Sequence, residues 1–151
     1  GSQLNYLALQ ALCDEARMIQ VNNTTVARDA TAKSFVLNVG AAWARQEWLS
    51  RLEGENSHSD MLSVSIARNK QEFDQRTFQH HASPRSYSDL LYKNTLYDES
   101  RTVFSGLILV DDGAHYTDAY QTCRNLMMSE TAESNSMPGL ERTKRWLSER
   151  P

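Results

Sequence analysis

Short runs of alternating apolar and polar residues, each ended by turn-forming residues, are the strongest pattern in the chain. Residues 31–39 place Phe35, Leu37 and Val39 on one face of an extended strand, and residues 62–66 repeat the alternation with serines opposite. No long amphipathic helix is indicated in the middle of the chain. The pattern therefore predicts a mainly β protein.

Further strands are predicted over residues 85–94, 101–110 and 117–126, with short polar turns between them. Residues 41–52, rich in Trp and Arg, are compatible with a helix or a strand, and a strand is favoured. Residues 103–110 carry apolar side chains on both alternating faces, so this strand is expected to be covered on both sides.

The predicted strands recur at a nearly constant interval of 12 to 16 residues. Their centres lie at Leu37, Leu49, Val64, Thr77, Leu91, Leu107 and Gln121. Such regularity is typical of a β-sandwich or of a β-solenoid, and the spacing alone leaves both open.

The two ends of the chain differ from its middle. Residues 4–17 are compatible with one helix or with a strand, because their apolar residues also fit helical spacing. In residues 140–151, charged residues surround the single pair Trp146 and Leu147, which predicts a short helical tail.

Charge and cysteine content exclude several classes of protein. Sixteen Lys and Arg against 19 Asp and Glu give a net charge of −3, which is unfavourable for binding nucleic acid. The sequence indicates neither a signal peptide nor a membrane span, and it fits a reducing, cytoplasmic compartment. Cys13 and Cys123 lie far apart, so we expect no cysteine-ligated metal or cluster, and no cofactor, in this chain.

Motifs for enzymatic chemistry are absent from the sequence. It has no phosphate-binding loop, dinucleotide-binding fingerprint, nucleophile elbow or metalloprotease helix, so we expect no enzyme and no ATPase by itself. His80 and His81 could suggest a metal, but neighbours on a strand point to opposite faces, which favours one packed and one solvated histidine. Asp111 and Asp112 could form a catalytic carboxylate pair, but with Gly113 behind them they favour a tight turn in which the glycine has a positive φ.

Lys93 interrupts an apolar stretch and alternates with Leu91 and Asp89. It is either an edge cation with a packed aliphatic stem or a buried functional cation that needs a charged partner.

Four ordered blocks of residues carry a resemblance to a known family. They are residues 88–93 (SDLLYK), 101–108 (RTVFSGLI), 113–121 (GAHYTDAYQ) and 124–129 (RNLMMS). In order and spacing they resemble the core of the SufB/SufD family of the SUF iron–sulfur cluster assembly system. The amino-acid sequence of the last two blocks is more similar to SufD than to SufB.

The resemblance implies a right-handed parallel β-helix, which selects the solenoid over the sandwich. It implies an N-terminal segment over residues 1–27 that enters the β-helix, a SufB/SufD-like core over residues 28–141, and an unmatched charged tail over residues 142–151. Family members continue into further coils with a Cys-Ser-His type motif, so a truncated β-helix is expected here. Its open last coil predicts a homodimer through the β-helix edges unless the tail covers it.

The resemblance also implies a function. Family members are scaffold components that pair with SufB-like proteins and with the ATPase SufC, in the cytoplasm or, for plastid-bearing organisms, the plastid stroma. An iron–sulfur cluster is then expected only in the assembled complex. Lys93 aligns with a lysine of SufB-type cores associated with sulfur transfer, which implies that it points into the core and stabilises an anionic sulfur species or a carboxylate such as Asp89.

A different class of protein stays open beside this one. A stand-alone carbohydrate-binding or carbohydrate-cleaving β-solenoid could use Trp43, Trp48 and Tyr87 as sugar platforms, although packing in the core or at an edge is the simpler interpretation.

Overall fold

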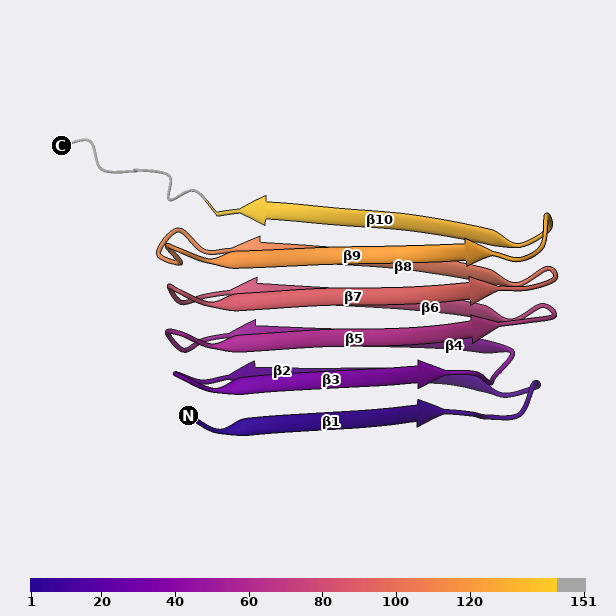
Figure 1. Cartoon of the computed structure of the whole chain (residues 1–151), viewed down its shortest axis with the longest axis horizontal. Helices are drawn as coiled ribbons and strands as arrows, with labels where there is room; N and C mark the ends of the chain where they lie inside the picture. Colours follow the sequence, from indigo (N-terminus) through magenta and orange to yellow (C-terminus); the bar gives the residue numbers. More distant parts are fainter. Residues whose placement is uncertain (144–151) are drawn as a thin grey trace.

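The computed structural model describes residues 1–143, and all of their regular structure is β-strand (Figure 1). The ten strands are β1 (Gln3–Gln10), β2 (Arg17–Val26), β3 (Thr31–Asn38), β4 (Trp43–Leu52), β5 (His58–Ala67), β6 (Glu72–His81), β7 (Tyr87–Leu96), β8 (Arg101–Val110), β9 (Asp118–Met127) and β10 (Glu133–Arg142). The predicted all-β class is confirmed, including the favoured strand over residues 41–52. No helix that could span a membrane occurs in this part of the chain.

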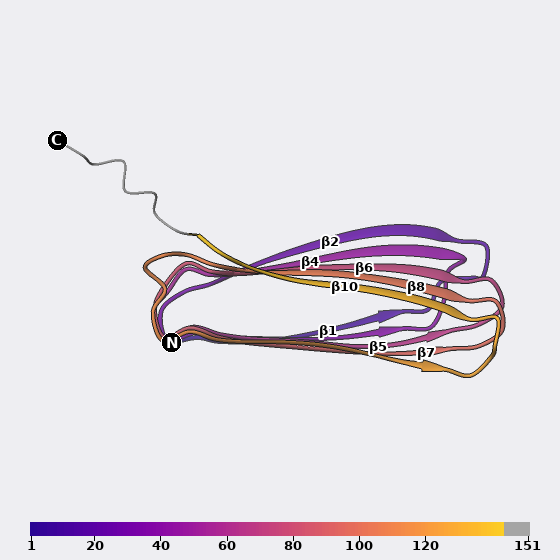
Figure 2. The ribbon, with the colours of Figure 1, turned by 90° about the horizontal axis from the view of Figure 1, so that it is seen from above.

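The strands form two parallel sheets that the chain enters alternately. Odd-numbered strands follow the order β1-β3-β5-β7-β9, and even-numbered strands the order β10-β8-β6-β4-β2. Seen from above, the two sheets face each other and short loops join them at both ends (Figure 2). Each pair of consecutive strands is thus one coil stacked on the previous one, so the chain is a parallel β-solenoid and not a sandwich.

Side chains at equivalent positions of successive coils lie in rows along the solenoid. In the odd sheet, Phe35 pairs with Leu62 and Leu62 with Leu91 on the outer face. Alternate residues of each strand face inward, as the burial pattern of β5 and β7 shows. The main apolar core consists of Val36, Trp48, Met61, Leu90, Tyr92 and Phe104.

The turns of successive coils also stack, and seven non-glycine residues in them adopt a positive φ. Stacked side chains stabilise them: Asn56 Nδ2 donates to Asp29 Oδ1 at 2.9 Å, and the Asn69 backbone N–H donates to Asp98 Oδ2 at 2.9 Å. In the loop after β8 the positive φ belongs to Tyr116, at 58°, and not to Gly113 as expected. Each of these turns thus contains one residue in the left-handed conformation. In the loop between β8 and β9 that residue is Tyr116, three residues after Gly113.

The ends of the described chain are strands. Residues 3–10 form β1, which resolves the choice between helix and strand for this part of the segment. Strand β10 runs through Pro138 to Arg142, so the prediction of a helical tail is wrong for residues 140–142. Proline fits there because β10 has only β8 beside it and needs no second row of hydrogen bonds. Residues 144–151, the rest of the predicted tail, lie outside the described residues.

Candidate functional site

A ladder of amide and hydroxyl side chains runs through the interior of the solenoid. Asn38, Ser65, Asn94 and Asn125 occupy the same inward position on β3, β5, β7 and β9. Asn38 Nδ2 donates to Ser65 Oγ at 3.1 Å, and Asn94 Nδ2 donates to Asn125 Oδ1 at 2.8 Å. From the opposite sheet, Gln75 Nε2 donates to Ser65 Oγ at 2.8 Å and exchanges hydrogen bonds with Asn94. Most of these groups satisfy one another, although Asn38 Oδ1 is buried without a partner, and the bonds of Gln75 tie the two sheets together.

Cys123 lies beside this ladder on β9. Its Sγ atom is 3.7 Å from Asn94 Nδ2, and it lies 3.8 Å from Asn125 Oδ1 and 3.8 Å from Ser136 Oγ. Burial raises the pKa of the Cys123 thiol, which outweighs the lowering by its hydrogen bonds to Ser136 and Asn125. The sulfur therefore stays protonated at neutral pH and is a weak nucleophile.

The adjacent histidines face opposite sides of β6, as the alternation predicted. His81 is fully buried, and its ring nitrogens lie 2.7 Å from Ser86 Oγ and 2.8 Å from Ser88 Oγ. Burial, and secondarily the neighbouring His80, lowers the pKa of His81 to about 4, so the ring is neutral at pH 7. His80 is half-buried on the outer face, with Nε2 3.0 Å from Asp111 Oδ2.

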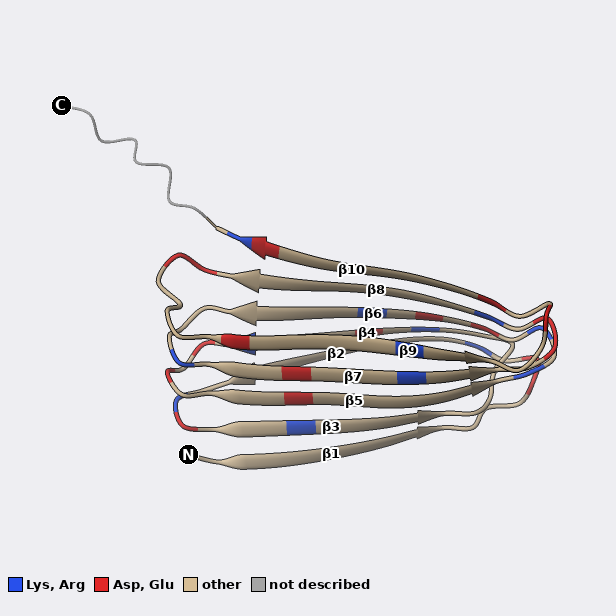
Figure 3. Ribbon diagram, turned by 45° about the horizontal axis from the view of Figure 1, so that its top comes forward, with Lys and Arg blue, Asp and Glu red and all other residues tan. Residues whose placement is uncertain are grey.

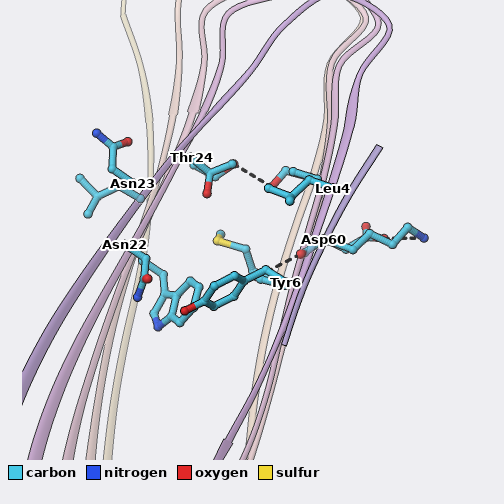
Figure 4. Close-up of a pocket in the computed structure, with 14 residues that line it drawn as sticks. Leu4, Tyr6, Asn22, Asn23, Thr24 and Asp60 are labelled. Atoms are coloured by element: carbon cyan, nitrogen blue, oxygen red, sulfur yellow. Dashed lines mark hydrogen bonds and ion pairs between the residues drawn. The ribbon is translucent and has the colours of Figure 1, made fainter. Parts of the chain in front are cut away.

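A cavity of about 210 Å³ opens between the sheets at the first coils (Figure 4). Leu4 and Tyr6 of β1 form one side, and the Tyr6 ring lies 5.7 Å from the buried Trp48 ring. On β2, Asn22 Nδ2 is buried without a hydrogen-bond partner, close to Thr24. Most of the exposed lining is apolar, and the charged residues that also line it, Lys33 and Asp60, pair with each other at 3.1 Å. This lining does not supply the ligands of a metal ion.

Lys93 is exposed on the outer face of β7, with Asp89 and Leu91 on the same face. The expectation that it points into the core is therefore wrong. Leu90 and Tyr92 occupy the inward positions, so residue 93, of opposite parity, must face outward. A role of Lys93 in sulfur transfer stays a prediction.

The three proposed sugar platforms lie in three different environments. Trp48 is buried in the core, 5% exposed, whereas Trp43 and Tyr87 are half-buried on the outer faces of different sheets. Tyr87 packs on the His58 ring, with the ring centroids 4.4 Å apart. The three side chains do not share one surface on which a sugar chain could lie.

Metal-ligating side chains are scattered over the described coils. Within residues 1–143, no three side chains of His, Cys, Asp or Glu are grouped so that they could hold a metal ion. Asp111 and Asp112 lie in the turn region after β8, as the turn interpretation expected, where Asp111 meets His80 and Thr143. The chemistry of the described coils is thus that of hydrogen bonding, packing and surface charge.

Stacked parallel coils with a hydrogen-bonded polar interior define the chain as a parallel β-solenoid. The chain belongs to the family described as "SUF system FeS cluster assembly, SufBD core domain", whose model matches residues 1–145. The resemblance noted in the four sequence blocks is thereby confirmed.

Individual relatives agree with the family. The chain is 36% identical over 120 residues to the iron–sulfur cluster assembly protein SufD of Escherichia coli K12, covering 80% of this chain and 28% of that protein. It is 24% identical over 148 residues to a SufBD family protein of Mycobacterium leprae, covering 93% of this chain and 38% of that protein. A SufBD family protein of Synechocystis is 26% identical over 132 residues, covering 86% of this chain and 29% of that protein. The chain thus spans roughly a third of the length of these relatives and is closer to SufD within the family.

Proposed function

We propose that the chain is the β-helix core of a SufD-like scaffold in SUF iron–sulfur cluster assembly, and that it is not catalytic by itself. The observation that carries the proposal is the match of the SufBD core domain over residues 1–145. SufB-like and SufC-like proteins are the proposed partners. Because the sequence lacks a phosphate-binding loop, ATP hydrolysis is assigned to the SufC-like protein.

The physical properties of the coils support a scaffold role. Each sheet is continuously hydrogen-bonded from coil to coil, and the asparagine ladder joins the two sheets from inside. Such an interior leaves little freedom for the coils to move relative to one another, so surface groups keep fixed spacings. A rigid array of this kind suits the positioning of partner proteins. The iron–sulfur cluster is assigned to the assembled complex.

The experiment uses the full-length protein in the cells from which the sequence comes. An affinity-tagged copy is purified, its partners are identified by mass spectrometry, and the activity of a cluster-dependent enzyme is measured after deletion of the gene. We expect SufB-like and SufC-like proteins in the purified complex, and loss of the enzyme activity that the plasmid-borne gene restores.

Two results would contradict this function. One is a purified protein without either partner together with unchanged cluster-dependent activity. The other is binding to a glycan array without these partners, which would favour the carbohydrate-binding alternative.

Two accompanying properties are also proposed. We place the protein in the cytoplasm, or in the plastid stroma if the source has plastids. Self-association through the last coil also stays a prediction. It is supported by the exposure of Leu126, Met127 and Leu140 there. Light scattering of residues 1–151 tests it, with a monomer at high concentration as the contradicting result.

A further inference from the structure

On the outer face of the odd-numbered sheet, defined here as face A, the carboxylates lie on one side and Lys93 and Arg124 on the other, while Lys33 of β3 lies beside Asp60 on the carboxylate side (Figure 3). Asp60, Asp89 and Asp118 lie near the start of β5, β7 and β9, whereas Lys93 and Arg124 lie nearer the ends of β7 and β9. Asp89, Asp118, Lys93 and Arg124 make no ion pair within residues 1–143, although Asp60 contacts Lys33 and His58. Most of these charges are therefore available to a ligand.

An apolar row separates the carboxylates from Lys93 and Arg124. Phe35, Leu62 and Leu91 occupy one register position on β3, β5 and β7, and Thr122 follows on β9. Phe35 is 36% exposed, and both leucines are half-buried. Strand β7 is the strand that carries a carboxylate, an apolar residue and a cation in succession on this face, namely Asp89, Leu91 and Lys93.

The acidic side also shifts the titration of a neighbouring tyrosine. The pKa of Tyr87 is raised, first by partial desolvation and then by the negative charge of Asp89, Asp60 and nearby groups. Tyr120 lies next to Asp89 in the register and 6.0 Å from the Tyr87 ring. The acidic side is therefore an anionic, aromatic surface that favours cationic side chains.

The dimensions of face A match those of an α-helix. Four residues along a strand span about 13 Å, so the Asp89 and Lys93 rows are separated by slightly more than a helix diameter of about 10–12 Å. Successive coils are about 4.8 Å apart, and helix residues i and i+3 or i+4 rise by about 4.5–6 Å. A helix lying along the solenoid axis can thus place one apolar side chain on each coil.

We propose that face A binds an amphipathic α-helix of a separate partner protein. The helix lies along the row of Phe35, Leu62 and Leu91. It carries basic residues on the flank over Asp60, Asp89 and Asp118, and acidic residues on the flank over Lys93 and Arg124. This surface is independent of the proposed place of the protein in cluster assembly.

Other occupants fit the charges and hydrogen bonds less well. A β-strand cannot extend the sheet here, because β3, β5 and β7 already have neighbours on both sides. The carboxylates of the acidic side repel nucleic acid and anionic lipid.

The half-exposed centre with a charged rim is typical of a reversible contact between separate proteins. Four coils give room for about three helical turns, so the contact is small and we expect it to be weak or part of a larger interface.

Site-specific photo-crosslinking in the native cells tests the proposal with the full-length protein. Benzoylphenylalanine replaces Leu91 on face A, and in the matched control it replaces Leu107, which is also half-buried but lies on the outer face of β8. We expect an adduct at position 91 and none at position 107. Mass spectrometry should map the crosslinked peptide to an amphipathic helix with one basic and one acidic flank.

A charge-reversal variant supplies the second measurement. Lys93→Glu with Arg124→Glu should lower the adduct yield at position 91 at least about fivefold, because the two introduced carboxylates repel the acidic flank that the cations attract. Both side chains are exposed, so the thermal unfolding midpoint should not change.

Several results would overturn the proposal. They are no adduct at position 91, equal adducts at both positions, or an adduct to a lipid, to a second copy of this chain or to a non-helical segment. An unchanged yield in the charge-reversal variant would also overturn it.

Discussion

The outer faces of the two sheets have similar strands but arrange their charges in opposite ways. Face B, the outer face of the even-numbered sheet, alternates charges around a central square in which Arg45 lies beside Glu47 and Asp74, and Arg76 beside Asp74. The nitrogen–oxygen distances are 2.8 Å for Arg45 to Glu47 and 3.2 Å for Arg76 to Asp74. Face A has one such pair, Lys33 with Asp60, but an apolar row separates Asp89 and Asp118 from Lys93 and Arg124.

The difference shows how charge placement assigns a role to a surface. The ion pairs on face B, two within a strand and one between β4 and β6, compensate one another, so removing a shared member leaves its partners less compensated. On face A, Asp89 and Lys93 lie too far apart to pair, and their removal should cost little stability. We infer that face B stabilises the solenoid and that face A binds a partner.

The largest expected effect is the pH dependence of stability caused by His81, which lies inside the solenoid and on neither face. His81 has a pKa of about 4 in the folded chain against 6.5 as its ordinary value, so the unfolded chain binds more protons between these pH values. The contribution of the neutral His81 to the free energy of unfolding is therefore fully present above about pH 6.5. It decreases by up to about 3 kcal/mol as the pH falls towards 4.

Urea unfolding of the wild type and His81→Asn at several pH values measures this effect. The difference between the two proteins should change with pH only between about pH 6.5 and 4. A difference that is constant over this interval would show that His81 does not titrate as described, and the pH dependence would then belong to the surface carboxylates.

The second effect compares one carboxylate from each face. Asp74→Asn leaves Arg45 and Arg76 without their shared partner, and because Asp74 is only 9% exposed we expect a loss of about 1–3 kcal/mol. Asp89→Asn should change the free energy of unfolding by less than about 0.5 kcal/mol. Urea unfolding at pH 7 measures both, and equal losses would remove the distinction between the faces.

The smallest effect is the salt dependence of the same two variants. Raising the ionic strength from about 0.1 M to 1 M shortens the Debye length from about 10 Å to 3 Å, which weakens partly exposed ion pairs. The destabilisation by Asp74→Asn should therefore shrink by a few tenths of a kcal/mol, whereas Asp89→Asn should not respond. If the effect of Asp89→Asn depended on salt and that of Asp74→Asn did not, the ion pairs on face B would not stabilise the folded protein.

The strands could be predicted from the sequence because their alternation is strict. Residues 62–66 lie within β5, and their serines do not share a face with the neighbouring apolar residues. The alternation could not say which face of β7 is buried, since Leu90 and Leu91 are both apolar, and it left both orientations of Lys93 open. The inward orientation, which the family resemblance implied, is wrong. The helical tail expected over residues 140–151 is replaced up to Arg142 by β10, in which Pro138 fits because the strand has one neighbour.

The candidate site was less predictable than the fold. The opposite orientation of His80 and His81 follows from the strand period alone, but the Ser86 and Ser88 hydroxyls around His81 come from the next coil. The interior asparagine ladder was missed, because asparagine in a single sequence signals turns. Its only signal is the recurrence of Asn or Ser at one register position, which needs the coil alignment.

Carboxylate footprinting tests the division of roles between the faces most directly. The protein is labelled with a carbodiimide and glycine ethyl ester, once alone and once in complex with the partner that crosslinking at position 91 identifies. We predict that labelling of Asp89 and Asp118 slows at least about fivefold in the complex, while labelling of Asp112, exposed in the turn after β8, stays the same. Unchanged labelling of Asp89 and Asp118 in the complex would contradict the assignment of face A as the binding surface.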